Sequence, residues 1–554
     1  MNQASLPTVS PTLWTTRSSL VRKTGTWRTA APQYHATPAP CLAACPVNGR
    51  IAEWIGEMRN DNLRRAWEVL VDNNPFPAIA GRICHHPCES ACNRQFHDQA
   101  VSICALERVA GDTALAEGWR FAPPAKERRE RVAIVGGGPA GLSAAYQLRR
   151  RGIQVSLFES MPKLGGLMRY GIPDYRLDKA VLDGEIGRIV DLGIDLHLGH
   201  AVGGAESLQA LRERHDAVYL ATGASLAKRL PGLDHGGDWL IDSAEFLAAA
   251  NSGVPVACGA RVVVIGGGSA AMDVARTARR LGKQVTVLAL EPEAKLPAQR
   301  VEVEEATEEG VRFVCGAMLR STQAGQAGQV LGCVRVDFAP GAKRGEFSVT
   351  PVEGSAFTLE ADAVVPSIGQ DADVERWSAL VGAQGRVLGI DRTWRTSAEG
   401  IFAGGDVASM DRFVTQAVGM GKQAAIEIAR YVSGEPAGDG FEVGATVPFG
   451  EINTHYYPGA ERNEPATAAL EQRLSGFGEV QRALSAQQAL AETQRCFSCG
   501  TCTHCDNCYY YCPDIAIEKT DVGYAVKYDY CKGCGLCVEE CPTGSVTMRA
   551  EAML

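Results

Sequence analysis

The chain has 554 residues, enough for three or four domains, and its hydrophobic content of 45% and charged content of 21% are typical of a globular protein. Its net charge of −9 argues against a nucleic-acid-binding surface, and no stretch approaches the ~18 apolar residues of a membrane span. Most of its 19 cysteines lie in two terminal regions at short, regular spacing, which favours metal binding in a reducing cytoplasm over disulfides.

Residues 1–35 are rich in Ser, Thr, Pro and Arg and contain no apolar run that would make a secretory signal. We expect a flexible tail there, with a docking arm as the alternative. Residues 36–125 then read as a helical domain that carries cysteines at 41, 45, 84, 88 and 92. Three intervening residues place successive thiolates on one helical face, which predicts iron–sulfur ligation. Cys104 is expected to be a small buried residue instead.

Residues 130–250 carry a dinucleotide-binding pattern. A buried-strand pattern at 131–135 runs into Gly136-Gly-Gly138-Pro139-Ala140-Gly141, and a helix-forming stretch follows. In such a unit the first glycine makes the turn, the second admits the pyrophosphate and the third lets the helix pack on the strand. The next strand ends at Glu159, about 20 residues on, where a carboxylate can hold a ribose hydroxyl.

Two further segments fit an FAD site. Thr222-Gly223 follows a strand expected at 217–220, and Gly405-Asp406 ends another strand ahead of a helix expected over 413–431. The second of these segments falls in residues 386–440, so the FAD-binding domain is expected in two parts.

Residues 251–385, between those parts, repeat the dinucleotide pattern. A strand at 261–265 leads into Gly266-Gly-Gly268-Ser269-Ala270-Ala271, then Asp273 and a helix, and a second strand leads to Glu291. Alanine is allowed at the third glycine position. The sequence therefore predicts a nicotinamide-binding domain inserted in the FAD-binding domain. A degenerate, non-binding repeat is the alternative.

One long motif makes a family resemblance specific. The stretch 162–177, Pro-Lys-Leu-Gly-Gly-Leu-Met-Arg-Tyr-Gly-Ile-Pro-Asp-Tyr-Arg-Leu, resembles the signature of the glutamate synthase small subunit and dihydropyrimidine dehydrogenase group of flavoproteins. The resemblance covers roughly residues 41–435. It implies FAD in the first site, with Gly166, Leu167 and Arg169 among its contacts, a nicotinamide cofactor in the second, and N-terminal iron–sulfur ligation.

The resemblance also exposes one departure in the nicotinamide domain. NADPH-using members have two arginines after its second strand, where this chain has Leu290 and Glu291. A carboxylate there would bond a ribose hydroxyl and repel a 2′-phosphate, so NADH is expected to be favoured over NADPH. Arginines 276, 279 and 280 argue the other way, unless they form only a solvated helix face.

The family pattern has two N-terminal clusters, but its two earliest cysteines would fall near Gln33 and Ala36, which cannot bind iron. The resemblance implies at least one surviving [4Fe–4S] cluster. Its expected ligands are Cys45, Cys84, Cys88 and Glu107, with Glu107 where relatives place a non-cysteine ligand. Cys41 and Cys92 would be leftover thiols, and a rearranged all-cysteine cluster is the alternative.

Residues 496–554 contain C-x2-C-x2-C-x3-C-P twice, the spacing of a two-cluster ferredoxin. The fourth cysteine of each run binds the other cluster in that arrangement. A structural zinc site would not account for the Cys-Pro endings. The expected ligands of the first cluster are Cys502, Cys505, Cys508 and Cys541, and those of the second are Cys531, Cys534, Cys537 and Cys512. Cys496 and Cys499 could bind another metal or be structural, and residues 441–495 are expected to be a linker.

These patterns predict a multidomain α/β protein: a helical iron–sulfur domain, two Rossmann-like domains and an α+β ferredoxin domain. We expect a cytoplasmic NAD(P)H:acceptor oxidoreductase that moves electrons through FAD and [4Fe–4S] clusters to a redox partner protein or catalytic subunit. Because the flavin performs the chemistry, no acid–base residue is assigned. The alternatives are the diaphorase subunit of a 2-oxoacid:acceptor oxidoreductase, a glutamate synthase small subunit, and a non-enzymatic redox sensor or scaffold.

Overall fold

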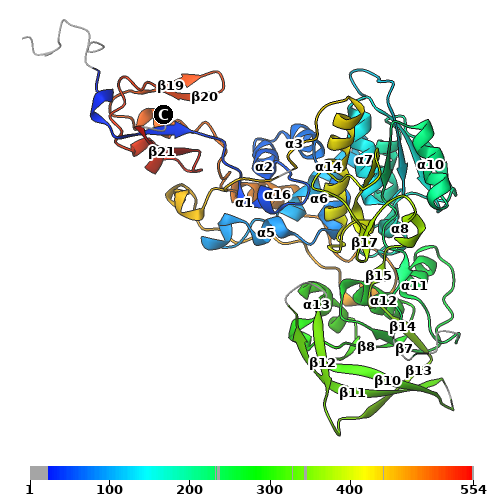
Figure 1. The fold of residues 1–554 in the computed structure, drawn as a ribbon. Coiled ribbons are helices and arrows are strands. Elements are labelled where there is room, and N and C mark those ends of the chain that lie inside the picture. The colour runs from blue at the N-terminus through cyan, green and yellow to red at the C-terminus, as the bar shows by residue number, and fades with distance from the viewer. Residues whose placement is uncertain are drawn as a thin grey trace, which may run out of the picture.

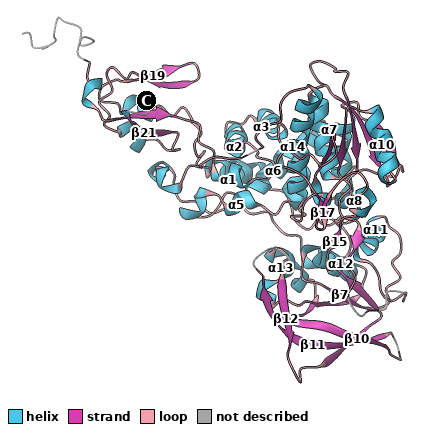
Figure 2. Cartoon of the chain, viewed as in Figure 1, coloured by secondary structure: helices cyan, strands magenta, loops and turns pink. Residues whose placement is uncertain are grey.

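The computed structural model describes residues 23–551 except 231–232, 234–236, 327, 342–345 and 441. Figure 1 shows the C-terminal module at one end, the two nucleotide-binding domains at the other, and the N-terminal helical domain between them. The helical domain is built of helices and loops, and the two nucleotide-binding domains combine helices with strands (Figure 2). Every chain segment that was expected to bind a cofactor falls in the described part, whereas residues 1–22 of the expected tail lie outside it.

The FAD-binding domain is formed by two separate chain segments, as predicted. Its parallel five-stranded sheet has the order β18-β5-β2-β3-β4. The strands are β2 (Arg131–Val135), β3 (Gln154–Glu159), β4 (Asp195–Leu198), β5 (Ala217–Leu220) and β18 (Ile401–Ala403). Helices α7 (Pro139–Arg150) and α14 (Val414–Val432) pack tightly, because a Cβ at Gly421 would lie 2.1 Å from the Ala140 carbonyl oxygen. The domain also contains α8 (Leu167–Tyr170), α9 (Lys179–Val190) and α10 (Gly204–Arg214).

The inserted domain has its own parallel sheet, in the order β14-β7-β8-β9, backed by α12 (Ser269–Arg280). The strands are β7 (Arg261–Ile265), β8 (Gln284–Leu288), β9 (Arg312–Val314) and β14 (Ala363–Pro366), and the other helices are α11 (Ser243–Asn251) and α13 (Arg300–Glu308). A second, antiparallel sheet is formed by β10 (Ala317–Ala324), β11 (Gln329–Pro340), β12 (Phe347–Pro351) and β13 (Phe357–Ala361). A short pair, β6 (Leu226–Ala227) and β15 (Gln370–Asp371), lies at the crossing between the two domains.

The N-terminal domain is a set of short helices: α1 (Pro40–Ala44), α2 (Ile51–Arg59), α3 (Leu63–Val71), α4 (Pro77–Ile83), α5 (Pro87–Ser90) and α6 (Ile103–Ala116). Helices α4 and α6 cross closely, since a Cβ at Gly111 would lie 2.2 Å from the Ala78 nitrogen. The expectation that Cys84, Cys88 and Cys92 share one helical face is wrong. His86 has φ 54° and Pro87 begins a new helix, so the chain turns between the cysteines.

The expectation of a flexible tail over residues 1–35 is wrong for residues 30–34, which form a strand. Strand β1 (Ala30–Tyr34) pairs antiparallel with β21 (Val546–Ala550), so the N-terminus completes the C-terminal module (Figure 1). Without β1 this edge of β21 would lack a hydrogen-bonding partner. The module also contains α17 (Asn507–Tyr510), α18 (Leu536–Glu539) and the hairpin β19 (Ile517–Thr520) with β20 (Gly523–Val526).

Residues 442–495, expected as a linker, instead pack along the FAD-binding domain, the nicotinamide domain and the helical domain. The Val480 N–H donates to the Tyr175 carbonyl at 2.9 Å, and Arg473 pairs with Glu308 at 2.6 Å. Helix α16 (Ala486–Gln494), preceded by the shorter α15 (Leu470–Leu474), packs on α2 and α6. The Glu492 carboxylate there accepts from the Ser102 N–H at 2.8 Å. The segment therefore connects the helical domain to both nucleotide-binding domains.

Candidate functional site

The first glycine loop forms the floor of a large cleft. Gly136 has φ 110°, and a Cβ there would lie 2.3 Å from the Ala221 carbonyl oxygen, so only glycine fits this turn. Gly138 is the N-cap of α7 and its position has no side chain to occupy the helix N-terminus. Gly141 lets α7 approach β2, because a Cβ there would lie 1.9 Å from the Gly136 carbonyl oxygen. The unpaired N–H groups at such a helix N-terminus favour a phosphate group.

Glu159 lies beside this loop at the end of β3. Its Oε2 accepts the Gly137 N–H at 2.7 Å, and its Oε1 accepts the Met161 N–H at 2.7 Å. The side chain is 7% exposed and lines the cleft. It is therefore held where the ribose hydroxyls of a dinucleotide would lie.

The other walls of the cleft come from distant parts of the chain. Gly166 approaches the glycine loop, since a Cβ there would lie 2.9 Å from the Gly138 Cα. Burial raises the pKa of Asp406 to about 6, although the nearby Arg412 opposes this. Of the residues expected in this site, eleven line the cleft: Gly136, Gly138, Pro139, Ala140, Glu159, Gly166, Leu167, Thr222, Gly223, Gly405 and Asp406.

Arg169 is an exception, because it does not line the cleft. Its Nε donates to the Leu164 carbonyl at 2.5 Å, and its guanidinium pairs with Asp183. The side chain therefore holds the loop that carries Gly165 and Gly166. Arg169 supports the site without facing it.

The second glycine loop repeats the geometry of the first. Gly266 has φ 134°, and a Cβ there would lie 2.3 Å from the Ser367 carbonyl oxygen. Gly268 is the N-cap of α12, whose first residues Ser269 and Ala270 are not buried, whereas Ala271 is. The Glu291 Oε2 lies 3.1 Å from a Cβ built on Gly267, the same distance that separates the Glu159 Oε2 from a Cβ on Gly137. Glu291 therefore takes the position in the second domain that Glu159 takes in the first.

Asp273, expected as a cofactor contact, has a different partner. It is 5% exposed and forms an ion pair with Arg176 at 2.8 Å, and Arg176 also reaches Glu302 at 2.7 Å. Tyr175 donates to the Asp273 carbonyl at 3.3 Å. The end of the 162–177 motif thus joins the FAD-binding domain to α12 of the inserted domain.

The arginines of α12 do not form the solvated face that was considered for them. Arg276 and Arg280 both pair with the buried Glu309 at 2.7 Å, and both lie over the Tyr175 ring. Arg279 donates to the Glu309 and Lys283 carbonyls. Their guanidinium groups are occupied within the interior and do not face the nucleotide loop.

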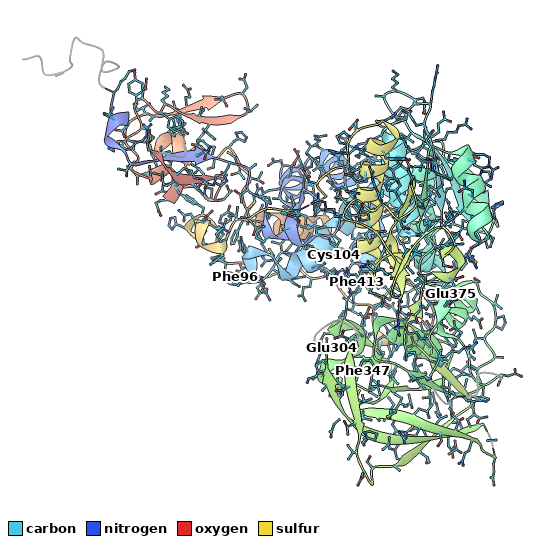
Figure 3. The ribbon with its side chains drawn as sticks, viewed as in Figure 1. Phe96, Cys104, Glu304, Phe347, Glu375 and Phe413 are labelled. Carbon is cyan, nitrogen blue, oxygen red and sulfur yellow. The ribbon has the colours of Figure 1, made fainter. Side chains whose placement is uncertain are left out.

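Sequence reasoning missed the residues that connect the cleft to the helical domain. Phe413, which Figure 3 labels, lines the cleft. Its ring stacks on that of His85, with centroids 3.9 Å apart. Two residues on, the Thr415 hydroxyl accepts a hydrogen bond from the Cys84 thiol at 3.7 Å. No spacing or motif marks Phe413 and Thr415, because their role depends on where α14 begins in space.

The expected N-terminal ligands lie close together. Burial raises the pKa of Cys84 to about 12, and the nearby Glu107 and Cys45 contribute by charge repulsion. Burial likewise raises the pKa of Cys88, with Cys45 and Cys84 contributing. Burial raises the pKa of Glu107 to about 7, and Asn74 donates to its Oε1 at 2.7 Å. Three thiols and one carboxyl, near enough for their charges to interact, fit the expected cluster site.

Cys41 and Cys92 were expected to be leftover thiols, but they share a small cavity with Cys496 and Cys499. These four cysteines come from the helical domain and from the segment before the ferredoxin runs. Sequence spacing could not pair them because about 400 residues separate the two groups.

The ferredoxin cysteines group as the crossed assignment predicts. Cys502, Cys505, Cys508 and Cys541 line one cavity, and Cys512, Cys531, Cys534 and Cys537 line another. Within the described residues, no three His, Cys, Asp or Glu side chains converge as the ligands of a single metal ion would. A four-iron cube instead binds each thiolate at a different corner, so its ligands stay apart. No described helix is long and apolar enough to cross a membrane.

Three family models match the chain. Residues 130–424 match pyridine nucleotide-disulphide oxidoreductase, residues 22–119 match dihydropyrimidine dehydrogenase domain II with its 4Fe-4S cluster, and residues 524–547 match the 4Fe-4S binding domain. The three matched regions correspond to the two nucleotide-binding domains, the helical domain and part of the C-terminal module.

Curated relatives share most of the chain. NADP(+)-dependent formate dehydrogenase subunit beta of Moorella thermoacetica is 33% identical, over 83% of this chain and 70% of that protein. The glutamate synthase [NADPH] small chain of Azospirillum brasilense is 32% identical, over 71% of this chain and 86% of that protein. The NAD-dependent dihydropyrimidine dehydrogenase subunit PreT homolog of Salmonella typhi is 32% identical, over 71% of this chain and 91% of that protein.

The expected resemblance, fold class and enzyme class are confirmed by these matches together with the two glycine-loop domains. The chain therefore belongs to the pyridine nucleotide-disulphide oxidoreductase family, as an NAD(P)H oxidoreductase with an FAD-type domain and iron–sulfur domains.

Proposed function

We propose that the protein is the electron-transfer subunit of a larger complex and exchanges electrons between NADH and a redox partner protein. FAD in the cleft would convert between hydride transfer and single-electron transfer. The glycine loop at 136–141 and Glu159 would hold its pyrophosphate and ribose. The second loop at 266–271 would hold the nicotinamide dinucleotide. The N-terminal and C-terminal cysteine groups would carry single electrons.

The observation that carries this proposal is the start of α14. Phe413 belongs to the wall of the cleft, and Thr415 contacts Cys84 of the N-terminal cysteine group at 3.7 Å. The flavin cleft and the first iron–sulfur site therefore meet across three consecutive residues. A sensor or scaffold would not require this contact between a nucleotide cleft and buried thiols.

The preference for NADH rests on Glu291. Its carboxylate lies beside the second glycine loop in the position that Glu159 takes in the first, where it would bond a 2′-hydroxyl and repel a 2′-phosphate. The arginines of α12 do not compensate, since Arg276 and Arg280 are paired with Glu309. Of the three relatives named above, two are named with NADP(+) or NADPH and one with NAD, so their names favour NADPH, and the proposal of NADH rests on Glu291 alone.

The partner is proposed to bind at the C-terminal module. Cys505 and Cys534 are exposed there, and Tyr510, Ile515 and Val522 present apolar surface that is 74%, 71% and 92% exposed. All three relatives named above are named as a subunit or chain, which favours a hetero-oligomer. We place the protein in a reducing cytoplasm, because most of its 19 cysteines stand at the short, regular spacing of metal ligands.

The test uses the full chain reconstituted anaerobically with FAD, iron and sulfide. Adding NADH should bleach the flavin absorbance and then reduce a dye acceptor, with NADPH less effective. Affinity purification from the native host should recover a second redox subunit. If neither nucleotide bleaches the bound flavin, the proposed function is wrong.

A further inference from the structure

Four cysteines that the proposed function does not use surround one small cavity. Cys41 lies in α1, Cys92 follows α5, and Cys496 and Cys499 follow α16. The cavity joins the helical domain to the segment that leads into the ferredoxin module. Its other walls are mostly apolar, with Ile55 and Phe497 among them, and the polar residues of the lining are Asn93 and Arg94. Four sulfur atoms from three separate stretches of chain are thus brought to one place.

Polar groups in this cavity are directed at the sulfurs. The Asn93 Nδ2 lies 3.5 Å from the Cys499 Sγ and also donates to the Val447 carbonyl at 3.0 Å. The Ser498 N–H lies 3.4 Å from the Cys496 Sγ. Both groups donate, as is required next to a thiolate. Hydrogen bonds to the ligand sulfurs are a regular feature of iron–sulfur sites.

The surrounding chain holds the Cys496–Cys499 loop in place. Arg495 is 2% exposed and pairs with Glu492 at 2.6 Å and with Asp98 at 3.0 Å. Gly500 has φ 69°, and a Cβ there would lie 1.9 Å from the Thr37 carbonyl oxygen. The loop is therefore fixed against the segment that leads to Cys41, and its two thiols are positioned rather than merely buried.

The Asn93 amide and the Ser498 N–H both point at cysteine sulfurs, and a neutral thiol accepts hydrogen bonds weakly. A bound metal centre would turn these thiols into thiolates, which accept hydrogen bonds from the same donors more strongly.

The geometry favours a cluster over a single zinc ion. A zinc site brings four sulfurs to within about 2.3 Å of one point. Among the described residues no such convergence occurs, at this cavity or at the two ferredoxin cavities, whose spacing marks them as cluster sites. The four cysteines here resemble the ferredoxin groups in both respects: each group lines a small cavity without converging.

We propose that Cys41, Cys92, Cys496 and Cys499 bind a further [4Fe–4S] cluster. Residues Gln33 and Ala36 stand where the family pattern has its two earliest cysteines, and Gln33 lies in β1, paired with Thr547 of the C-terminal module. The N-terminal strand is thus built into the ferredoxin module. Cys496 and Cys499, which precede that module, would then supply the two ligands that the N-terminal domain lacks.

The position of this cluster gives it a role, which rests on the proposed function. On one side, Cys41 and Cys45 lie one helical turn apart, and the Cys45 N–H bonds to the Cys41 carbonyl at 3.2 Å. On the other side, the Gly500 N–H donates to the Thr543 carbonyl at 2.7 Å, and Thr543 lies two residues from Cys541. The cluster would take one electron from one neighbour and give one to the other, with no bond made or broken.

The test compares iron and acid-labile sulfide in the reconstituted full chain. Wild type should contain about sixteen iron atoms per chain, from four clusters, and the Cys496→Ser/Cys499→Ser variant about twelve. Cys41→Ser gives an independent check from the other side of the cavity. Cys315→Ser, which removes a thiol of the nicotinamide domain away from every cysteine group, should leave the iron content unchanged.

The same samples separate this inference from the proposed function. FAD content and flavin bleaching by NADH should be unchanged in Cys496→Ser/Cys499→Ser, which shows that the chain is folded. If this variant and Cys41→Ser both retain the wild-type iron and sulfide content, or if the site holds zinc, the inference is wrong. If iron is lost but NADH never bleaches the flavin, the cluster stands and the proposed function fails.

Discussion

The Cys84 thiol lies 3.7 Å from the Thr415 hydroxyl, at the start of the helix whose first residues line the flavin cleft. This contact connects the cleft to the N-terminal cysteine group. It links two chain segments about 330 residues apart. The electron path proposed above depends on it more than on any other pair of residues.

Thr415→Val tests this contact directly. With Cys84 bound to iron, the Thr415 hydroxyl would donate to its sulfur and stabilise the reduced cluster. Losing one such bond costs about 1 kcal/mol, or roughly 40 mV for one electron, so the midpoint potential should fall by tens of millivolts. A redox titration followed by electron paramagnetic resonance measures it. Thr415→Ser keeps the hydroxyl and should behave as wild type, and an equal fall in both variants would contradict the assignment.

Glu291→Arg should reverse the nucleotide preference. The substitution exchanges a carboxylate that repels a 2′-phosphate for a guanidinium that binds it. The ratio of kcat/KM for NADPH to that for NADH, measured with a dye acceptor, should rise at least about tenfold, or ~1.4 kcal/mol. Glu159→Gln, in the FAD site, should leave this ratio unchanged. A wild type that prefers NADPH would show that Glu291 does not face the 2′ position.

Arg176→Ala should loosen the docking of the nicotinamide domain. The change leaves the buried Asp273 without its partner, which costs about 3–5 kcal/mol. The melting temperature should fall and limited proteolysis should cut between the domains sooner. Arg176→Met/Asp273→Leu removes both charges and should recover part of the loss. If the double variant is no more stable than Arg176→Ala, the pair is not what holds the domains together.

Gln33→Pro tests the strand exchange at the N-terminus. Gln33 is exposed, and it shares the register in which the His35 N–H donates to the Ser545 carbonyl. Proline cannot donate to this ladder, so the β1–β21 pair should lose one hydrogen bond, which costs about 1 kcal/mol. Hydrogen exchange should then show faster exchange in residues 546–550, while Gln33→Thr keeps the wild-type rate. Equal rates in both variants would show that β1 does not protect this edge.

Asp406 should make the stability of the FAD-free protein depend on pH. Burial raises its pKa from 3.8 to about 6, so between these values the folded protein keeps a proton that the unfolded chain has lost. Stability from this group is therefore lost as the pH rises through that window. Asp406→Asn removes this pH dependence. The free energy of unfolding of the variant, relative to that of wild type, should therefore rise by roughly 1 kcal/mol between about pH 5 and about pH 7. Denaturant midpoints measure this. If the stability of Asp406→Asn relative to wild type falls over this pH range instead, the pKa of Asp406 in the folded protein is not raised.

Local patterns in the sequence predicted those parts of the fold that depend on neighbouring residues. The glycine turns at Gly136 and Gly266 follow from short-range sterics, and the crossed grouping of the ferredoxin cysteines follows from their spacing. Both could be predicted because the residues that determine them lie within one supersecondary unit or one repeated motif.

The errors concern contacts between residues far apart in the chain. Asp273 follows a glycine loop, so the sequence alone assigns it to the cofactor. Only the fold shows that Asp273 forms an ion pair with Arg176. The role of the buried α12 arginines was ambiguous because a strand and a helix separate them from their partner Glu309 in the sequence. The structure of residues 30–34 was predicted wrongly because their partner strand lies at the other end of the chain. The role of Cys496 and Cys499 was left open because they share a cavity with cysteines of the N-terminal domain.

The central claim is that FAD connects NADH to the iron–sulfur clusters. The most direct measurement is electron paramagnetic resonance of the reconstituted chain, frozen after anaerobic addition of excess NADH, with and without bound FAD. The account predicts reduced-cluster signals only in the FAD-loaded sample. Clusters that stay oxidised after the flavin has bleached, or that become reduced equally without FAD, would contradict it.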